Sequence, residues 1–170
     1  MIKCRRACAL AVATGIAVAG CGSGGQSSST SSQASFKSGF ATTQRDFRQL
    51  GTDIAKDITG AGKKTDAAIA DEFRTLATRA GQQAAQLDAL HAPARYRNQV
   101  AKMFSGFHAV KDDLSNIATA ATSHNASNAE AATRELLHDA ATIKSADNAL
   151  SKSLGLPAPG VSSTSTSSSG

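Results

Sequence analysis

The sequence of 170 residues contains no tryptophan, one tyrosine, three prolines and three cysteines. All three cysteines lie within the first 21 residues, at positions 4, 8 and 21, so the remainder of the chain has neither a disulfide nor thiol chemistry. Alternating β-branched residues and Asn-Gly turns are also absent, which excludes a predicted β-sheet. Because G-x-S-x-G, P-loop and H-E-x-x-H motifs are missing as well, we predict that the protein is not an enzyme.

The N-terminus has the pattern of a bacterial secretory signal. Three basic residues precede an apolar run of about a dozen residues: Lys3, Arg5 and Arg6, then residues 7–18. A transmembrane helix needs about 20 apolar residues, so this run is too short to span a bilayer. We therefore predict a signal peptide over residues 1–20, cleaved between Gly20 and Cys21. Sec export is favoured, with twin-arginine export as the alternative.

The end of this segment, Val18-Ala19-Gly20-Cys21, resembles the lipobox of bacterial lipoproteins at all four positions. The resemblance implies that the Cys21 thiol receives a diacylglyceryl group before cleavage. Two acyl chains suffice for stable anchoring, at roughly 0.8 kcal/mol per buried methylene. We therefore expect an exported protein held on the extracytoplasmic face of the cell membrane through Cys21. A plain secretory peptide and an uncleaved transmembrane helix are the alternatives.

The basic character of the whole chain comes mostly from the signal peptide. The full sequence has 18 basic and 13 acidic residues, and the signal peptide holds three of the basic residues and none of the acidic ones. The mature chain therefore carries 15 basic against 13 acidic residues, a net charge of +2. With this small net charge and a single tyrosine, the protein lacks both the positive electrostatic field and the aromatic side chains for base stacking that a nucleic-acid-binding protein needs.

Two stretches of low complexity flank the central part of the chain. Residues 21–35 consist of the cysteine predicted to be lipidated, followed mainly by Gly, Ser, Thr and Gln. Residues 157–170 end the chain mainly in Ser and Thr. Such compositions cannot bury apolar surface, so we predict a flexible tether with a reach of roughly 20 Å and a disordered tail. O-glycosylation of these stretches is the alternative interpretation. The single folded domain is expected at residues 36–156.

Within that domain, apolar residues recur at helical spacing in four segments. The four stripes are Phe36, Phe40, Phe47, Leu50, Ile54 and Ile58; Ile69, Phe73, Leu76, Ala80, Ala84, Leu87 and Leu90; Tyr96, Val100, Met103, Phe107, Val110, Leu114, Ile117 and Ala121; and Ala129, Leu136, Leu137, Ala140, Ile143, Leu150 and Leu154. Short breaks between them favour an all-α, antiparallel up-down-up-down four-helix bundle. Since every stripe is aliphatic, aromatic or Ala, we expect no polar groups to converge inside it.

Boundary residues support this assignment. The expected stops and starts are Gly60–Gly62, Thr65, Pro93 and Gly155, with Gly155 in the left-handed position that ends a helix. The start of the fourth helix has two solutions. Either Asn125 caps it directly, or Ser127 and Glu130 form a capping box.

The whole arrangement is similar to a class of small, uncharacterised lipoproteins from high-GC Gram-positive, actinobacterial-type bacteria. Besides the lipobox and the Ser-rich tether, the matching features are the connector Leu87-x-x-Leu90-x-x-Pro93-x-x-Tyr96 and the closing Leu154-Gly155-Leu156-Pro157. These motifs are folding signals. The resemblance therefore implies a location and a helical fold, and it carries no activity.

Two pairs of residues have the spacing of metal ligands. Glu135 and His138 form an E-x-x-H, which di-iron bundles use twice, but the sequence holds one copy. Both residues lie about 120° to 180° from the apolar stripe of their helix, so we predict that they face solvent and hold no metal. His108 and Asp112 are expected to form a solvated pair. The other histidines, His91 and His124, fall in predicted connectors.

These observations leave two classes of function. The first is a tethered, non-catalytic interaction module that presents a helical face to an envelope protein, a cell-wall polymer or an exported substrate. The alternative is an extracytoplasmic receptor for a small molecule or an ion. Because a receptor needs polar groups converging in its interior, the apolar stripes favour the interaction module, which requires no cofactor.

Overall fold

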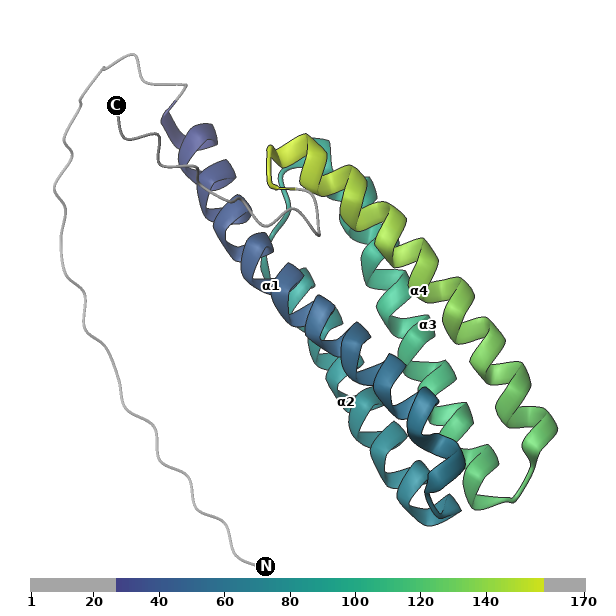
Figure 1. The fold of residues 1–170 in the computed structure, drawn as a ribbon. Helices are drawn as coiled ribbons and strands as arrows, with labels where there is room; N and C mark the ends of the chain where they lie inside the picture. Colours follow the sequence, from purple (N-terminus) through teal and green to yellow (C-terminus); the bar gives the residue numbers. More distant parts are fainter. Residues whose placement is uncertain (1–26, 158–170) are drawn as a thin grey trace, which may run out of the picture.

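In the computed structural model, which describes residues 27–157, four α-helices form an antiparallel up-down-up-down bundle (Figure 1). The predicted fold is confirmed. The elements are α1 (Ser27–Gly60), the 3-10 turn η1 (Ala61–Lys63), α2 (Asp66–Ala89), the 3-10 turn η2 (Ala94–Tyr96), α3 (Arg97–Thr122) and α4 (Ala126–Leu154). Within residues 27–157, no strand forms, and no helix is both long and apolar enough to cross a membrane.

Side chains cap the starts of α2 and α4. The Thr65 hydroxyl accepts a hydrogen bond from the Ala68 amide at 3.3 Å, which confirms its predicted role. The Asn125 side chain accepts one from the Asn128 amide at 3.0 Å. Asn125 therefore caps the fourth helix directly, and the alternative capping box of Ser127 and Glu130 does not form its start. Each cap satisfies an amide that has no partner within its helix.

Helix α4 ends at the predicted glycine. Gly155 adopts φ 60° and ψ 40°, a left-handed conformation that only glycine reaches without a steric cost. The Leu156 amide then donates to the Ser151 carbonyl at 2.9 Å, and the Gly155 amide to the Lys152 carbonyl at 3.2 Å. These two bonds form the expected Schellman arrangement.

Helix α1 begins at Ser27 and not at Phe36, so residues 27–35, predicted as part of the tether, are helical. This segment contains neither Gly nor Pro. Nothing therefore stops the helix from extending backward from the packed residues further along α1. Gln33 takes part in the fold, because its Nε2 donates a hydrogen bond to the Tyr96 hydroxyl at 3.4 Å. The predicted boundary of the tether was wrong for this segment.

The helices do not pack equally tightly. Helix α3 lies between α2 and α4 and contacts both along much of its length, whereas α1 lies mainly against α2 and touches α4 little. The close approach of α3 to α4 depends on Gly106, where an added Cβ would lie 2.5 Å from Ile143 Cγ1. Between α1 and α2, Arg79 contributes a cross-helix ion pair, with its guanidinium 2.6 Å from the Asp53 carboxylate.

The buried core follows the predicted stripes with one clear exception. Phe40, Phe107 and Leu136 are at most 1% exposed, but Leu137 is 60% exposed. Adjacent helical residues lie about 100° apart around the axis. Leu136 therefore points into the bundle, while Leu137 points toward the side on which α1 does not close on α4. The prediction that Leu137 belongs to the core was wrong.

Candidate functional site

The incomplete closure of α1 on α4 creates an apolar groove, which we call the α1–α4 groove. It has a volume of about 380 Å³ and a floor contributed by α3. Its walls and floor consist of Phe47, Arg48, Leu50, Gly51, Ile54, Ala55 and Ile58 from α1, Phe107 and Val110 from α3, and Leu136, Leu137, Ala140, Ile143, Lys144 and Asp147 from α4. Cavities of about 300 to 1,000 Å³ lined mainly by apolar side chains are the usual sites of small ligands.

Local sequence explains why the groove stays open. On α1, Gly51 and Ala55 are four residues apart, so they lie on one face of the helix, and both line the groove. An added Cβ at Gly51 would meet no atom within 4 Å. Small residues therefore leave the α1 wall low, and the large side chains Phe47, Ile54 and Ile58 are only partly buried. Together with exposed Leu137, they form an apolar surface that faces outward.

Polar side chains meet inside the bundle at one end of this groove. Gln44 Nε2 donates hydrogen bonds to Asp147 Oδ1 at 2.8 Å and to Ser151 Oγ at 2.5 Å, and all three residues are at most 5% exposed. The expectation of an interior without converging polar groups was therefore wrong. The three groups satisfy one another, so this cluster joins α1 to α4 rather than offering free bonds to a ligand.

The same cluster contains a carboxyl group with a shifted pKa, that of Asp147. Burial raises the pKa of Asp147 above its usual range, although the hydrogen bond from Gln44 and the positive charge of Arg48 act in the opposite direction. Burial is thus the largest of the opposing effects on the pKa of Asp147.

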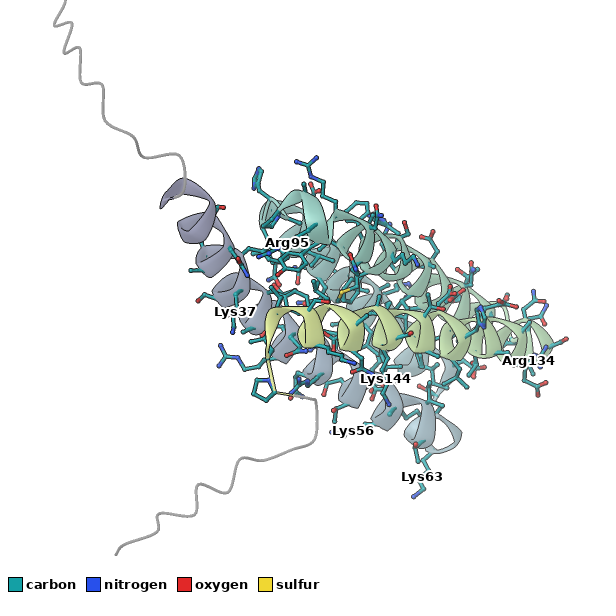
Figure 2. All side chains as sticks on the ribbon, turned by 90° about the horizontal axis from the view of Figure 1, so that it is seen from above. Lys37, Lys56, Lys63, Arg95, Arg134 and Lys144 are labelled. Atoms are coloured by element: carbon teal, nitrogen blue, oxygen red, sulfur yellow. The ribbon has the colours of Figure 1, made fainter. Side chains whose placement is uncertain are left out.

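Two cations lie at the rim of the α1–α4 groove. Arg48 and Lys144 line it from opposite walls, and both side chains are exposed. Among the described residues, neither forms an ion pair with a carboxylate within 4 Å. Lys144 and Lys56 extend toward the same side of the molecule in Figure 2. The apolar groove is therefore bordered by positive charge.

A second buried carboxyl group lies between α3 and α4, outside the groove. Asp113 is 9% exposed, and its Oδ2 has no hydrogen-bond partner in the described part of the chain. Burial, reinforced by the negative charges of Asp139, Glu135 and Asp112, raises the pKa of Asp113 to about 6. Sequence analysis did not identify this residue. Within residues 27–157, no group of three or more His, Cys, Asp or Glu side chains has the geometry of a metal site.

The predicted metal-ligand pairs lie on the surface. Glu135 and His138 are exposed, as their positions on the helix predicted. His108 and Asp112 are exposed too, but no hydrogen bond or ion pair between them occurs in the described range. His108 packs its ring against Phe104 with 4.6 Å between ring centroids. The predicted pair therefore does not form.

The connector histidines have structural partners. His91 and His124 both adopt positive φ angles, 49° and 52°, at the ends of the helices they follow. His91 Nδ1 lies 2.6 Å from the Ala89 carbonyl, and His124 Nδ1 lies 2.5 Å from the Asp66 carboxylate. The His124 contact joins the α3–α4 turn to the start of α2.

The lipobox residues, Val18, Ala19, Gly20 and Cys21, lie outside the described residues, as does the signal peptide of residues 1–20. Most of the predicted Ser/Thr-rich tail, residues 158–170, also lies outside them. The candidate functional site within the described part is therefore the α1–α4 groove. No protein-family model, no curated protein and no solved structure matches this chain.

Proposed function

We propose that the protein is a membrane-anchored lipoprotein of the bacterial cell envelope and acts as a non-catalytic binding module. The proposed anchor is a diacylglyceryl group on Cys21, on the extracytoplasmic face of the cell membrane. The lipobox at residues 18–21 and the basic and apolar segments before it support this location.

The proposed binding face is the α1–α4 groove, and the observation that carries this proposal is the exposure of Leu137. It is the one large hydrophobic residue with an exposed side chain in the described part of the chain, at 60%. It also borders a groove of about 380 Å³ with an apolar floor. Contiguous exposed apolar surface on a soluble domain marks an interaction site more often than a scattered single residue does.

A lipid anchor on Cys21 has a direct consequence for processing. Replacing Cys21→Ala removes the thiol that lipid transfer requires, so we expect a full-length precursor that the lipoprotein peptidase does not cleave. Wild-type protein is expected to incorporate radiolabelled palmitate and to partition into the detergent phase. Wild-type protein that appears in the culture medium without a lipid label contradicts the proposed anchor.

The binding face is tested with a charge placed on it. Leu137→Asp puts a carboxylate on the exposed apolar rim, so we expect cross-linking of the lipidated protein to its envelope partner to fall at least tenfold. Glu135→Ala, an exposed change on the same helix, is the matched control and is expected to leave cross-linking unchanged. Equal cross-linking of both variants places the binding face elsewhere. Circular dichroism and thermal melting of both variants verify that they fold.

A small-molecule receptor is the second candidate function. It is favoured by the volume of the groove, which falls in the range of ligand sites. The interior polar cluster around Gln44 does not favour it, because its bonds are satisfied internally.

A further inference from the structure

The chemistry of the α1–α4 groove restricts what it can bind. The most deeply buried side chains of its lining, Leu50, Phe107 and Ile143, are at most 1% exposed and offer no hydrogen bonds. Asp147, the one acidic residue in the lining, is 2% exposed and accepts a hydrogen bond from Gln44, so its carboxyl group is turned away from the groove's opening to solvent. A ligand with polar groups along its length would lose its hydrogen bonds to water without replacement. The floor therefore fits an unbranched or weakly branched hydrocarbon.

The volume of the groove limits the size of this hydrocarbon. If a methylene group takes up about as much space as a water molecule, roughly 30 Å³, then 380 Å³ holds about a dozen methylenes. A whole helix, about 10 to 12 Å wide with its side chains, cannot be enclosed in a groove of about 380 Å³ and would insert only single side chains into it. The groove thus fits one acyl chain better than a peptide helix.

The charge at the rim selects the head group of such a ligand. Arg48 and Lys144 stand on opposite walls, and within residues 27–157 neither forms an ion pair. The positive charge of Arg48 acts on the Asp147 carboxyl group, and Lys144 lies three residues before Asp147 on α4. Arginine and lysine on two sides of an opening favour an anion between them.

We propose that the α1–α4 groove binds a long-chain fatty carboxylate, with the acyl chain on the floor and the carboxylate near Arg48 and Lys144. This inference rests on the binding face proposed above and, within it, on the second candidate function, a receptor for a small molecule, whose ligand class it names. The hydrocarbon contributes most of the affinity, and the two cations distinguish a carboxylate from a neutral or cationic amphiphile of the same length.

Dodecanoate is the probe, and isothermal titration calorimetry below its micelle concentration is the measurement. The protein used is the mature chain, residues 21–170, with Cys21→Ser. This substitution prevents lipidation, so the protein can be purified without a detergent that would compete for the groove. We expect one dodecanoate per chain, no binding of butanoate, and at least tenfold weaker binding of dodecyltrimethylammonium. Absence of dodecanoate binding, or equal binding of the cationic amphiphile, overturns the proposal.

Substitutions locate the ligand. Gly51→Leu fills the groove from α1, so we expect dodecanoate affinity to fall at least tenfold, whereas Gly62→Leu, on an exposed turn with no atom within 4 Å of its added Cβ, is the matched control. Lys144→Gln is expected to weaken dodecanoate binding by threefold to tenfold. The control is Lys63→Gln, which changes an exposed lysine of η1 outside the groove lining and is expected to leave dodecanoate binding unchanged. Equal effects at both glycines overturn the proposed location.

Two further results separate this inference from the proposed function. If dodecanoate does not bind while Leu137→Asp still abolishes cross-linking to an envelope partner, the fatty-acid proposal is wrong and the binding face stands. If sedimentation shows a dimer of the unlipidated wild-type chain that Leu137→Asp dissociates, a second copy occupies the groove. That outcome also overturns the fatty-acid proposal.

Discussion

Replacing Asp113→Asn is expected to stabilise the protein at pH 7.5 by about 1 to 3 kcal/mol. Asp113 is 9% exposed, its Oδ2 has no hydrogen-bond partner in the described part of the chain, and Asp139 and Glu135 repel its charge. An amide of the same shape removes the charge and can donate a hydrogen bond to the Asp139 carboxylate. Urea unfolding at pH 7.5 and 4.5 measures the change, with exposed Asp112→Asn as the control.

The sign of the pH dependence follows from the raised pKa. Asp113 has a pKa of about 6 in the fold against an ordinary value of 3.8, so the folded state holds a proton that the unfolded chain has already released between these values. Its favourable contribution is therefore complete below about pH 4 and is lost as the pH rises through 6, at about 1.4 kcal/mol per pKa unit. Asp147, whose pKa is also raised, adds a dependence of the same sign. Wild-type stability that does not fall between pH 4.5 and 7.5 contradicts this account.

The second large effect distinguishes two adjacent leucines. Leu136→Ala is expected to lower the free energy of unfolding by about 2 to 5 kcal/mol, because a side chain that is 1% exposed leaves a cavity in the core. Leu137→Ala is expected to change it by less than about 0.5 kcal/mol, because that side chain is 60% exposed. The Phe107 ring packs against that of Phe47 with 5.2 Å between ring centroids. Phe107→Ala is therefore expected to lower the free energy of unfolding by about 3 to 5 kcal/mol.

Urea titrations of the mature chain with Cys21→Ser provide these values. Similar losses for Leu136→Ala and Leu137→Ala would mean that α1 closes over Leu137 in solution, and would remove the basis for the α1–α4 groove. The adjacent pair serves as its own matched control, since both residues have the same side chain on the same helix.

The helices and their caps could be predicted because the signals are local. Thr65, Asn125 and Gly155 act on amides and carbonyls within a few residues of themselves, so their roles do not depend on how the helices pack. Leu137 could not be placed in this way. Both leucines fit a wide apolar stripe, and the side on which α1 leaves the bundle open is a property of packing between helices.

The sequence carries a signal for the buried polar residues. Gln44 stands four residues after Phe40 and three before Phe47, so it occupies a position of the apolar stripe. Asp147 has the same relation to Ile143 and Leu150. A polar residue at a stripe position at helical spacing predicts a buried polar group. What the spacing cannot predict is the partner, because Gln44 and Asp147 are brought together by the packing of α1 on α4.

Asp113 follows the same rule, three residues after Val110 and four before Ile117. Its pKa is raised first by burial and then by acidic neighbours from both α3 and α4, namely Asp139, Glu135 and Asp112. Asp112 is its neighbour in the sequence, but Glu135 and Asp139 come near it only through the packing of α4 on α3.

If Cys21 is lipidated as proposed, the early start of α1 limits the distance between the groove and the membrane. With Cys21 lipidated, residues 22–26 span at most about 18 Å before the helix begins at Ser27. At 1.5 Å per residue, Phe47 lies about 30 Å further along α1, so in an upright bundle the groove is well above the head groups of the lipids. In the proposed arrangement, a fatty acid bound in the groove would be held outside the bilayer, in the aqueous layer of the envelope.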